Sequence, residues 1–380
     1  MKKLKIVFAS NFMNHHQLTV SDEFNKVSDY HFIATESVPG DRLSLGYKDM
    51  NKMCDYIVRS YESEDEMKKA LELIDKADVV IFGSAPFEMV EQRIIDNKLT
   101  FRYSERLFKN KKLIRMFHPR VIKSVRSTCT KYKDRDYYLL CASAYSKDDY
   151  GWFGAFKNKT FKWGYFPKID EIKDINKCIK NKMKSNTILW CGRFIDWKHP
   201  EYAIDCAKFL VKKGIDFKMK MVGTGPLLDK IKNKVTKCGL DSCVEVVGSL
   251  PFDQVQEEMK NSKVFLFTSD QNEGWGAVLN ESMGNACCVI ANEKIGSVPY
   301  IVEDGINGYT YKTKKEFLNK VNIALSNEKT SENICKEAYN AIHSNWIPSV
   351  AVSNFMDLVK MIKAGKVSEI KSDNRPCTKA

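Results

Sequence analysis

Short, continuous apolar runs recur along this chain of 380 residues and alternate with longer amphipathic segments. Such runs predict strands buried on both faces, and the segments between them predict helices that cover a parallel sheet. In the first part of the chain the runs occupy residues 4–10, 31–36, 55–61, 78–84, 99–105 and 137–143. Residues 63–77 are a clear crossover helix, because Ser63 can cap it and Glu66 follows three residues later.

The pattern restarts after a polar, lysine-rich stretch, residues 167–186, which we interpret as a linker. The sequence therefore predicts an α/β protein with two doubly wound, Rossmann-like domains, residues 1–166 and 187–347. A last helix is expected at about 348–364, crossing back over the junction, and residues 365–380 are expected to be disordered. The second set of strands is predicted at residues 187–194, 217–225, 244–250, 264–269 and 287–293, with helices at 200–214 and 226–240 among them.

Composition excludes several classes of protein. Hydrophobic residues make up 43% of the chain, too many for a disordered protein, and no apolar run approaches the roughly 18 residues of a membrane span. The first apolar run ends at Asn11 and Asn14 without a small-residue cleavage site, which favours a buried strand over a signal peptide. Twelve cysteines without metal-like spacing predict a reduced, cytoplasmic protein that binds no metal.

The formal net charge of +13 favours an anionic partner: nucleic acid, a membrane surface or a phosphorylated substrate. A basic, lysine-rich organism is the alternative explanation. Residues 106–133 contain ten Lys and Arg and no Asp or Glu, interleaved with apolar residues and interrupted at Pro119. This segment predicts an interfacial patch for an anionic membrane, peripheral at its inner face, or else a packed helix with a solvated basic face. No nucleic-acid-binding motif is present, so nucleic acid is not an expected partner.

Candidate binding residues follow the strands of the second domain, where ligands of doubly wound sheets bind. Gly192, Arg193 and Lys198 come after its first strand. Arginine binds phosphate oxygens bidentately and lysine adds a compact charge, although two solvated cations on a loop would look the same. Gly223 and Gly225 follow the next strand and suit either a phosphate turn or a plain strand-to-helix turn.

Two glutamates, Glu273 and Glu281, stand eight residues apart around the start of a predicted helix. Eight residues span about 12 Å along a helix, too far for a glycosidase pair at about 5–9.5 Å. Glu273 precedes the helix, and Glu281 is expected on its second or third turn. The free N–H groups between them suit a diphosphate, with a hydroxyl-rich group on each side. A solvated surface glutamate is the alternative, but Trp275 between two glycines argues against an unremarkable loop.

The order of these motifs resembles the C-terminal domain of the retaining GT-B-fold glycosyltransferases of family 4, also called glycosyl transferases group 1. The resemblance covers about residues 187–350 and implies two Rossmann-like domains facing a cleft. The motifs that carry it are Gly192–Arg193–Lys198, Gly223–Gly225–Pro226, Glu273–Glu281, and Gly296, Tyr300–Ile301 and Asn307–Gly308.

The resemblance also implies roles for these residues. Arg193 and Lys198 would hold the diphosphate of a nucleotide-sugar, Glu273 would lie beside the donor sugar, and Glu281 would bind the ribose hydroxyls. No cofactor and no essential metal are implied, in agreement with the absence of a DxD motif at a strand end. The remaining donor-binding positions are Gly192, Gly223, Gly225, Gly274, Trp275, Gly276 and Ala277.

The first domain resembles a subset of bacterial members tied to surface-polysaccharide assembly, through Asn14–His15–His16, Glu105–Arg106 and residues 162–167. Many relatives carry a catalytic histidine after the fifth strand, and here Ser104 or Glu105 takes that place. Asn14, His15 and His16 are expected to form an acceptor or phosphate loop, in which a histidine would touch donor phosphates or an acceptor hydroxyl. The alternative for the two histidines is that they cap the following helix or are partly buried.

The resemblance thus predicts a retaining hexosyltransferase that moves a sugar from a nucleotide-diphosphate sugar, with a UDP-sugar as the expected donor, to a glycan or lipid-linked saccharide. Two rival functions remain open. One is a sugar-nucleotide epimerase of the same fold, and the other is a relative that binds nucleotide-sugar without turning it over.

Overall fold

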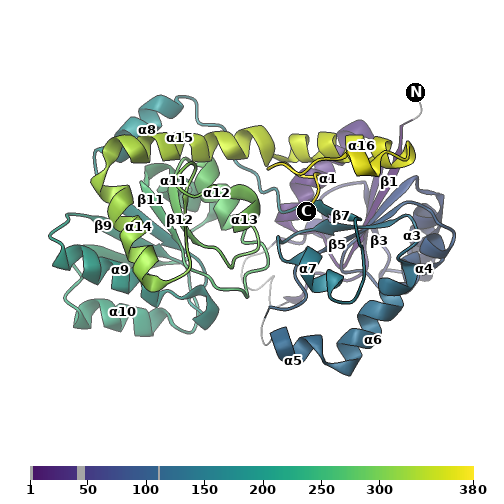
Figure 1. The fold of residues 1–380 in the computed structure, drawn as a ribbon, viewed down its shortest axis with the longest axis horizontal. Coiled ribbons are helices and arrows are strands. Elements are labelled where there is room, and N and C mark those ends of the chain that lie inside the picture. Colours follow the sequence, from purple (N-terminus) through teal and green to yellow (C-terminus); the bar gives the residue numbers. More distant parts are fainter. Residues whose placement is uncertain (1–2, 41–47, 110–111) are drawn as a thin grey trace. The chain divides into compact units, whose positions relative to one another are not determined.

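The computed structural model describes residues 3–40, 48–109 and 112–380, with the side chains of Lys112 and Leu113 excepted. The chain forms two compact units (Figure 1). The first unit contains residues 1–167 and 348–380, and the second contains residues 168–347. Each unit is built on a parallel sheet, so the predicted α/β fold with two Rossmann-like domains is confirmed.

The first unit has a seven-stranded sheet with the order β3-β2-β1-β4-β5-β6-β7. The strand order reverses between β1 and β4, and this reversal is the switch point at which doubly wound sheets bind ligands. The strands are β1 (Lys5–Ser10), β2 (Asp29–Ala34), β3 (Ile57–Arg59), β4 (Val79–Phe82), β5 (Thr100–Ser104), β6 (Tyr137–Cys141) and β7 (Thr160–Lys162).

The helices of this unit begin where the sequence supplies caps. The Ser63 hydroxyl accepts from the backbone N–H of Glu66, as predicted for the crossover helix, and Pro119 begins a new helix after the predicted break. Helix α16 packs on α1, and its buried Phe355 contacts the ring of Phe101, with centroids 5.1 Å apart. The helices are α1 (His15–Val27), α3 (Glu64–Lys76), α4 (Glu88–Ile95), α5 (Lys112–Met116), α6 (Pro119–Thr128), α7 (Ser146–Gly151) and α16 (Pro348–Lys363).

The expected disorder of residues 365–380 is wrong. The end of the chain pairs with β7, where the Lys162 N–H donates to Thr378 O at 2.8 Å and the Cys377 N–H donates to Lys162 O at 2.7 Å. Cys377 and Thr378 are buried. A polar sequence gives no sign of this pairing, because backbone groups at a sheet edge accept a strand of almost any composition.

The second unit has a six-stranded sheet with the order β10-β9-β8-β11-β12-β13, and its strand order reverses between β8 and β11. Its strands are β8 (Thr187–Cys191), β9 (Lys218–Val222), β10 (Val244–Gly248), β11 (Val264–Phe267), β12 (Cys288–Asn292) and β13 (Tyr309–Tyr311). Its helices are α8 (Ile175–Met183), α9 (Glu201–Lys212), α10 (Leu228–Lys237), α11 (Phe252–Asn261), α12 (Val278–Gly284), α13 (Val298–Ile301), α14 (Lys314–Ser326) and α15 (Glu328–Asn345).

Helix α8 lies inside the stretch interpreted as a linker, residues 167–186. Asp174 caps the helix, and its buried face packs against α11 and α15. The fully buried Lys182 Nζ donates to three carbonyl oxygens, those of Met259, Ser262 and Asn285, each at 2.8 Å. Most of the predicted linker is therefore an integral part of the second unit.

Candidate functional site

Loops after β8 and β11 meet at the switch point of the second unit. Lys198 Nζ forms a short salt bridge with Glu273 Oε2, and the Ser269 hydroxyl donates to the same carboxylate oxygen at 2.9 Å. Both charged side chains are largely buried, with 14% and 12% of their surface exposed. The structure thus brings together two predicted site residues that stand 75 positions apart.

Arg193 lies at the same strand end and is exposed. Its guanidinium lies 5.8 Å from the centre of the Trp197 ring, and Lys198 Nζ lies 4.9 Å from the centre of the same ring. Among the described residues Arg193 forms no salt bridge, and it is the one arginine in the sequence between residues 168 and 347. Its guanidinium donors are therefore available to a phosphate.

Gly223 and Gly225 allow two loops to touch. Both have positive φ, +135° and +150°, and a Cβ on Gly223 would lie 1.9 Å from the carbonyl oxygen of Gly192. The Gly223 N–H donates to Gly248 O at 2.6 Å. This N–H is engaged, so the first glycine shapes the turn that supports Gly192 and Arg193.

The loop that carries Glu273 ends at Gly276, where φ is +85° and a Cβ would lie 2.4 Å from the Phe267 ring. Trp275 is fully buried, and its indole N–H donates to Asn280 Oδ1 at 3.0 Å. Its ring packs on Trp346 with centroids 5.4 Å apart. The side chain of Trp275 therefore anchors the loop in the core, and the Ser297 hydroxyl donates to its carbonyl oxygen at 2.6 Å.

Glu281 lies in the first turn of α12, so its expected place on the second or third turn is wrong. The helix begins at Val278, because Gly276 keeps a left-handed conformation and Ala277 is the cap. Burial raises the pKa of Glu281 to about 7, and the positive charge of Lys198 opposes that shift. A carboxyl group that titrates near neutrality thus lies at the candidate site.

This shift predicts a pH dependence of stability. Because the folded-state pKa lies above the unfolded value of about 4.3, Glu281 stabilises the fold at low pH and that contribution is lost as the pH rises to 7. Between pH 5 and pH 8 the wild type should lose about 2 kcal/mol of unfolding free energy relative to Glu281→Gln. Urea unfolding of both proteins at the two pH values measures the difference, and parallel pH profiles would refute it.

A histidine that the sequence did not single out connects the two loops. His199 Nδ1 lies 2.9 Å from Glu201 Oε1, and its Nε2 lies 3.2 Å from Asp270 Oδ2. The hydrogen bond with Glu201 is the main cause that raises the pKa of His199, and Asp270 adds to it. The Thr268 hydroxyl also donates to Lys198 O at 2.6 Å. These bonds fix the backbone on both sides of Lys198, and only the position of His199 beside that lysine hinted at this role.

In the first unit, Asn14 caps α1 with hydrogen bonds from the N–H groups of His16 and Gln17. The His16 ring stacks on Tyr165 with centroids 4.9 Å apart, and burial lowers the pKa of His16, with His15 adding to the shift. The cap of the helix is thus Asn14 and not a histidine, and His15 and His16 are partly buried, as one alternative for them expected.

Tyr165 also connects this loop with Glu105. The Tyr165 hydroxyl donates to Glu105 Oε1 at 2.5 Å, and Lys109 Nζ binds Oε2. Both oxygens of Glu105 are thus engaged. Sequence reasoning did not assign a role to Tyr165, although it lies inside the motif at 162–167.

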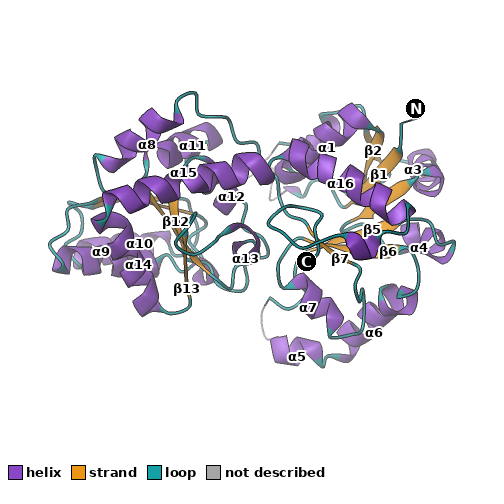
Figure 2. Cartoon of the chain, turned by 45° about the horizontal axis from the view of Figure 1, so that its top comes forward, coloured by secondary structure: helices purple, strands orange, loops and turns teal. Residues whose placement is uncertain are grey.

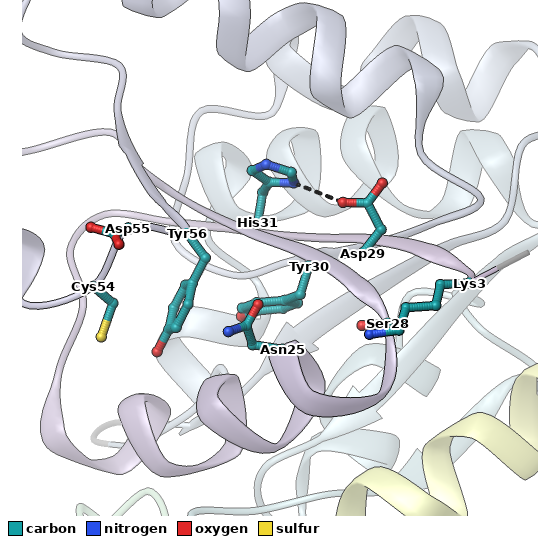
Figure 3. Close-up of a pocket in the computed structure, with 9 residues that line it drawn as sticks. All are labelled: Lys3, Asn25, Ser28, Asp29, Tyr30, His31, Cys54, Asp55 and Tyr56. Atoms are coloured by element: carbon teal, nitrogen blue, oxygen red, sulfur yellow. Dashed lines mark ion pairs between the residues drawn. The ribbon is translucent and has the colours of Figure 1, made fainter.

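Cavities occur at both edges of the first sheet. One of about 690 Å³ lies at the amino ends of β2 and β3, where Asp29 and His31 form an ion pair (Figure 3). Another of about 580 Å³ lies at the carboxyl ends of β4 and β5 and includes Glu105 and Tyr165. Because parallel sheets bind ligands at their carboxyl edge, the cavity at the ends of β4 and β5 is the candidate ligand site of the first unit.

Two further observations apply to the described residues, 3–40, 48–109 and 112–380. No three His, Cys, Asp or Glu side chains there are grouped so that they could hold a metal ion. None of the helices in these ranges combines the length and apolarity needed to cross a membrane.

Solved structures share the fold of this chain. HepE of Anabaena, solved in complex with UDP, is similar with a TM-score of 0.66 and 15% identity, over 97% of this chain and 100% of that one. TarM of S. aureus, solved in complex with fondaparinux, α-GlcNAc-glycerol and UDP, gives a TM-score of 0.55 and 16% identity, over 77% and 59% of the two chains. Such neighbours are glycosyltransferases of the GT-B fold.

The sequence comparison matches part of the chain to a family model and to several relatives. Residues 171–341, nearly all of the second unit, match the family model described as Glycosyl transferases group 1. An uncharacterized glycosyltransferase of Methanocaldococcus jannaschii is 36% identical over 135 residues, which are 35% of this chain and 36% of the relative. The amylovoran biosynthesis glycosyltransferase AmsK of Erwinia amylovora is 26% identical over 127 residues, 32% of this chain and 31% of AmsK. The chain thus matches about a third of the length of these relatives.

Proposed function

We propose that this protein is a retaining glycosyltransferase that moves a sugar from a nucleotide-diphosphate sugar to a saccharide or lipid-linked saccharide. The observation that carries the proposal is the salt bridge of Lys198 and Glu273 at the strand end that also carries Arg193, an arginine without a salt bridge among the described residues, inside the segment that matches the family model. HepE was solved with UDP-glucose, and AmsK takes part in amylovoran biosynthesis. These relatives support a UDP-sugar as donor and a polysaccharide pathway as the setting.

The proposed chemistry needs little from a protein base. The bond between the anomeric carbon and the diphosphate breaks, and the acceptor oxygen bonds to that carbon on the same face. The leaving diphosphate takes the proton of the acceptor hydroxyl. Arg193 and Lys198 stabilise the charge that develops on the diphosphate, while Glu273 lies beside the sugar and Glu281 binds the ribose. The proposed reaction uses no cofactor and no essential metal.

A panel of UDP-, GDP- and ADP-sugars in a thermal-shift assay tests the donor site. The proposal expects one nucleotide class to raise the melting temperature, followed by slow release of free nucleotide from the best donor and faster release with an acceptor. An epimerase would instead convert the donor sugar without releasing nucleotide, and a non-catalytic relative would show the shift without either reaction. No shift with any of the donors would contradict the proposal.

We also propose that α5 and α6 bind an anionic membrane surface. Figure 2 shows the two helices following one another at the margin of the first unit. Ile114 and Phe117 are each 64% exposed, and Trp152 is 55% exposed and lies edge-on to Phe117 at 6.0 Å. Of the basic segment, residues 106–133, Asn110 and Lys111 lie outside the described residues. An apolar cluster flanked by cations suits the boundary between lipid headgroups and acyl chains.

Phe117→Ser should lower binding to vesicles of anionic phospholipid by roughly tenfold, because a buried phenylalanine contributes about 1.5–3 kcal/mol. Vesicle sedimentation measures the bound fraction. Phe252→Ser is the matched control, since Phe252 is 47% exposed on α11 of the second unit. Equal binding to anionic and neutral vesicles, or equal loss in the two variants, would rule out this surface.

A further inference from the structure

The cavity at the carboxyl ends of β4 and β5 contains a cation without a carboxylate partner. Three cations line it, Arg102, Arg106 and Lys109. Lys109 binds Glu105, and Arg106 lies 3.9 Å from the buried Asp149. Two of the three charges are therefore matched by carboxylates.

Arg102 is the remaining charge. Its Nε donates to the Tyr150 hydroxyl at 2.9 Å, and its guanidinium lies over the rings of Phe82 and Tyr150, 5.3 and 5.7 Å from their centres. No carboxylate among the described residues lies within salt-bridge distance of it. The two aromatic rings hold the guanidinium in place and Tyr137 adds a polar contact, while the remaining N–H donors can take an anion.

Hydroxyl side chains line the same cavity as this guanidinium. Ser104 ends β5, Tyr165 follows β7, and Ser124 and Thr128 lie on α6. Ser104, Thr128 and Tyr165 already donate to oxygens of Ser124 and Glu105, which leaves the Ser124 hydroxyl as the donor for a ligand. Hydroxyls and a forked guanidinium are the donors that protein sites use for phosphate oxygens. A carboxylate-lined cavity would instead suit neutral sugars, and here both oxygens of Glu105 are already engaged.

A second cavity, of about 470 Å³, adjoins the first and shares Arg102, Ser124 and Thr128 with it. Its other lining is largely apolar, with Arg115, His118 and Arg120 among the charged and polar members. The apolar lining residues are Leu107, Phe108, Val121, Val125 and Cys129. A phosphate held by Arg102 would thus have a hydroxyl-rich space on one side and an apolar one on the other.

From this arrangement we infer that the two cavities bind the phosphate ester of an acceptor that carries an apolar chain. Arg102 binds the phosphate, the first cavity takes the polar part of the acceptor, and the second takes the beginning of the chain. The exposed residues Ile114 and Phe117 lie in the segment of α5 and α6, which also lines the second cavity. They would face the membrane surface that holds such a molecule. The inference rests on the proposed function, because that function makes the bound molecule an acceptor. It adds the chemical class of the acceptor.

Binding of farnesyl monophosphate to the full chain tests the inference, with UDP at saturation to fill the donor site. Calorimetry should show at least tenfold tighter binding of farnesyl monophosphate than of inorganic phosphate or farnesol. Ser124→Asp should weaken that binding at least tenfold, because it places a negative charge between the two cavities. Ser124→Asn is the matched neutral control and should stay within twofold, and both variants should fold, since Ser124 is exposed.

Arg102→Lys provides the second variant and should also weaken binding about tenfold, because lysine lacks the bidentate fork. Inorganic phosphate bound as tightly as farnesyl monophosphate would overturn the apolar part of the inference. Unchanged binding of farnesyl monophosphate to Ser124→Asp would overturn the site itself. A loss of that binding in Arg193→Ala, with no loss in the cavity variants, would overturn it as well. The calorimetric measurement needs no turnover. It can therefore fail while the donor assay succeeds, and it can succeed while the donor assay fails.

Discussion

Replacing Arg193 by alanine is expected to lower turnover at saturating donor by about 10²–10³-fold, the effect of losing one preorganised donor to developing charge. Arg193 is the cation at this strand end without a salt bridge among the described residues, whereas Lys198 is paired with Glu273. Its loss would therefore remove charge from the leaving diphosphate without releasing a buried partner. The rate of nucleotide release at saturating donor measures the effect.

Two further variants sharpen this test. Arg193→Lys should keep part of the activity, since the charge remains but the bidentate fork is lost. Lys212→Ala removes a charge from an exposed position on α9 of the same unit and should leave turnover unchanged. Full turnover in Arg193→Ala would show that another group stabilises the diphosphate.

Lys182→Met is expected to lower the free energy of unfolding by about 3 kcal/mol, the second large effect. The substitution keeps an apolar stem of similar length but leaves the buried carbonyls of Met259, Ser262 and Asn285 without their charged donor. The carbonyls of Met259 and Ser262 keep the weaker donor Cys287 Sγ, so of the three carbonyls only that of Asn285 is left unsatisfied by the described residues. An unsatisfied buried acceptor costs about 1–3 kcal/mol, and the lost hydrogen bonds to a charged donor add to that cost. Urea denaturation followed by tryptophan fluorescence measures the loss.

Lys180→Met is the matched control, since Lys180 is exposed on the same helix two residues earlier. Its effect should stay within about 0.5 kcal/mol, as for most surface substitutions. Equal stability of the two variants would mean that α8 is not fastened to α11 and α12 through this amine. Donor binding by folded Lys182→Met should persist, because Lys182 has no contact with the candidate site loops.

Local sequence was sufficient for the strands and for several residues at their carboxyl ends. Apolar runs defined the strands, and a parallel sheet necessarily places the residues after β8 and β11 at one edge, which is how Lys198 and Glu273 meet. The glycine at 276 was expected to open the backbone to a ligand. The structure adds that its conformation delays the start of α12 and moves Glu281 into the first turn.

Long-range partners were beyond sequence reasoning. Trp275 stood out because it interrupts a glycine loop, and the structure adds that its ring packs on Trp346, 71 positions later. Tyr165 meets His16 and Glu105 only after the first sheet has formed. The pairing of Cys377 with β7 depends on backbone groups, which carry no compositional signal.

The division of the chain has a consequence for its synthesis. The first unit consists of residues 1–167 and 348–380, so α16 and the C-terminal segment that pairs with β7 leave the ribosome after the whole second unit. Until then Phe24, Phe101 and Trp163 lack Phe355, the ring on which all three pack. The second unit can therefore complete its folding before the first unit does. Until α16 has been made, the core of the first unit remains incomplete.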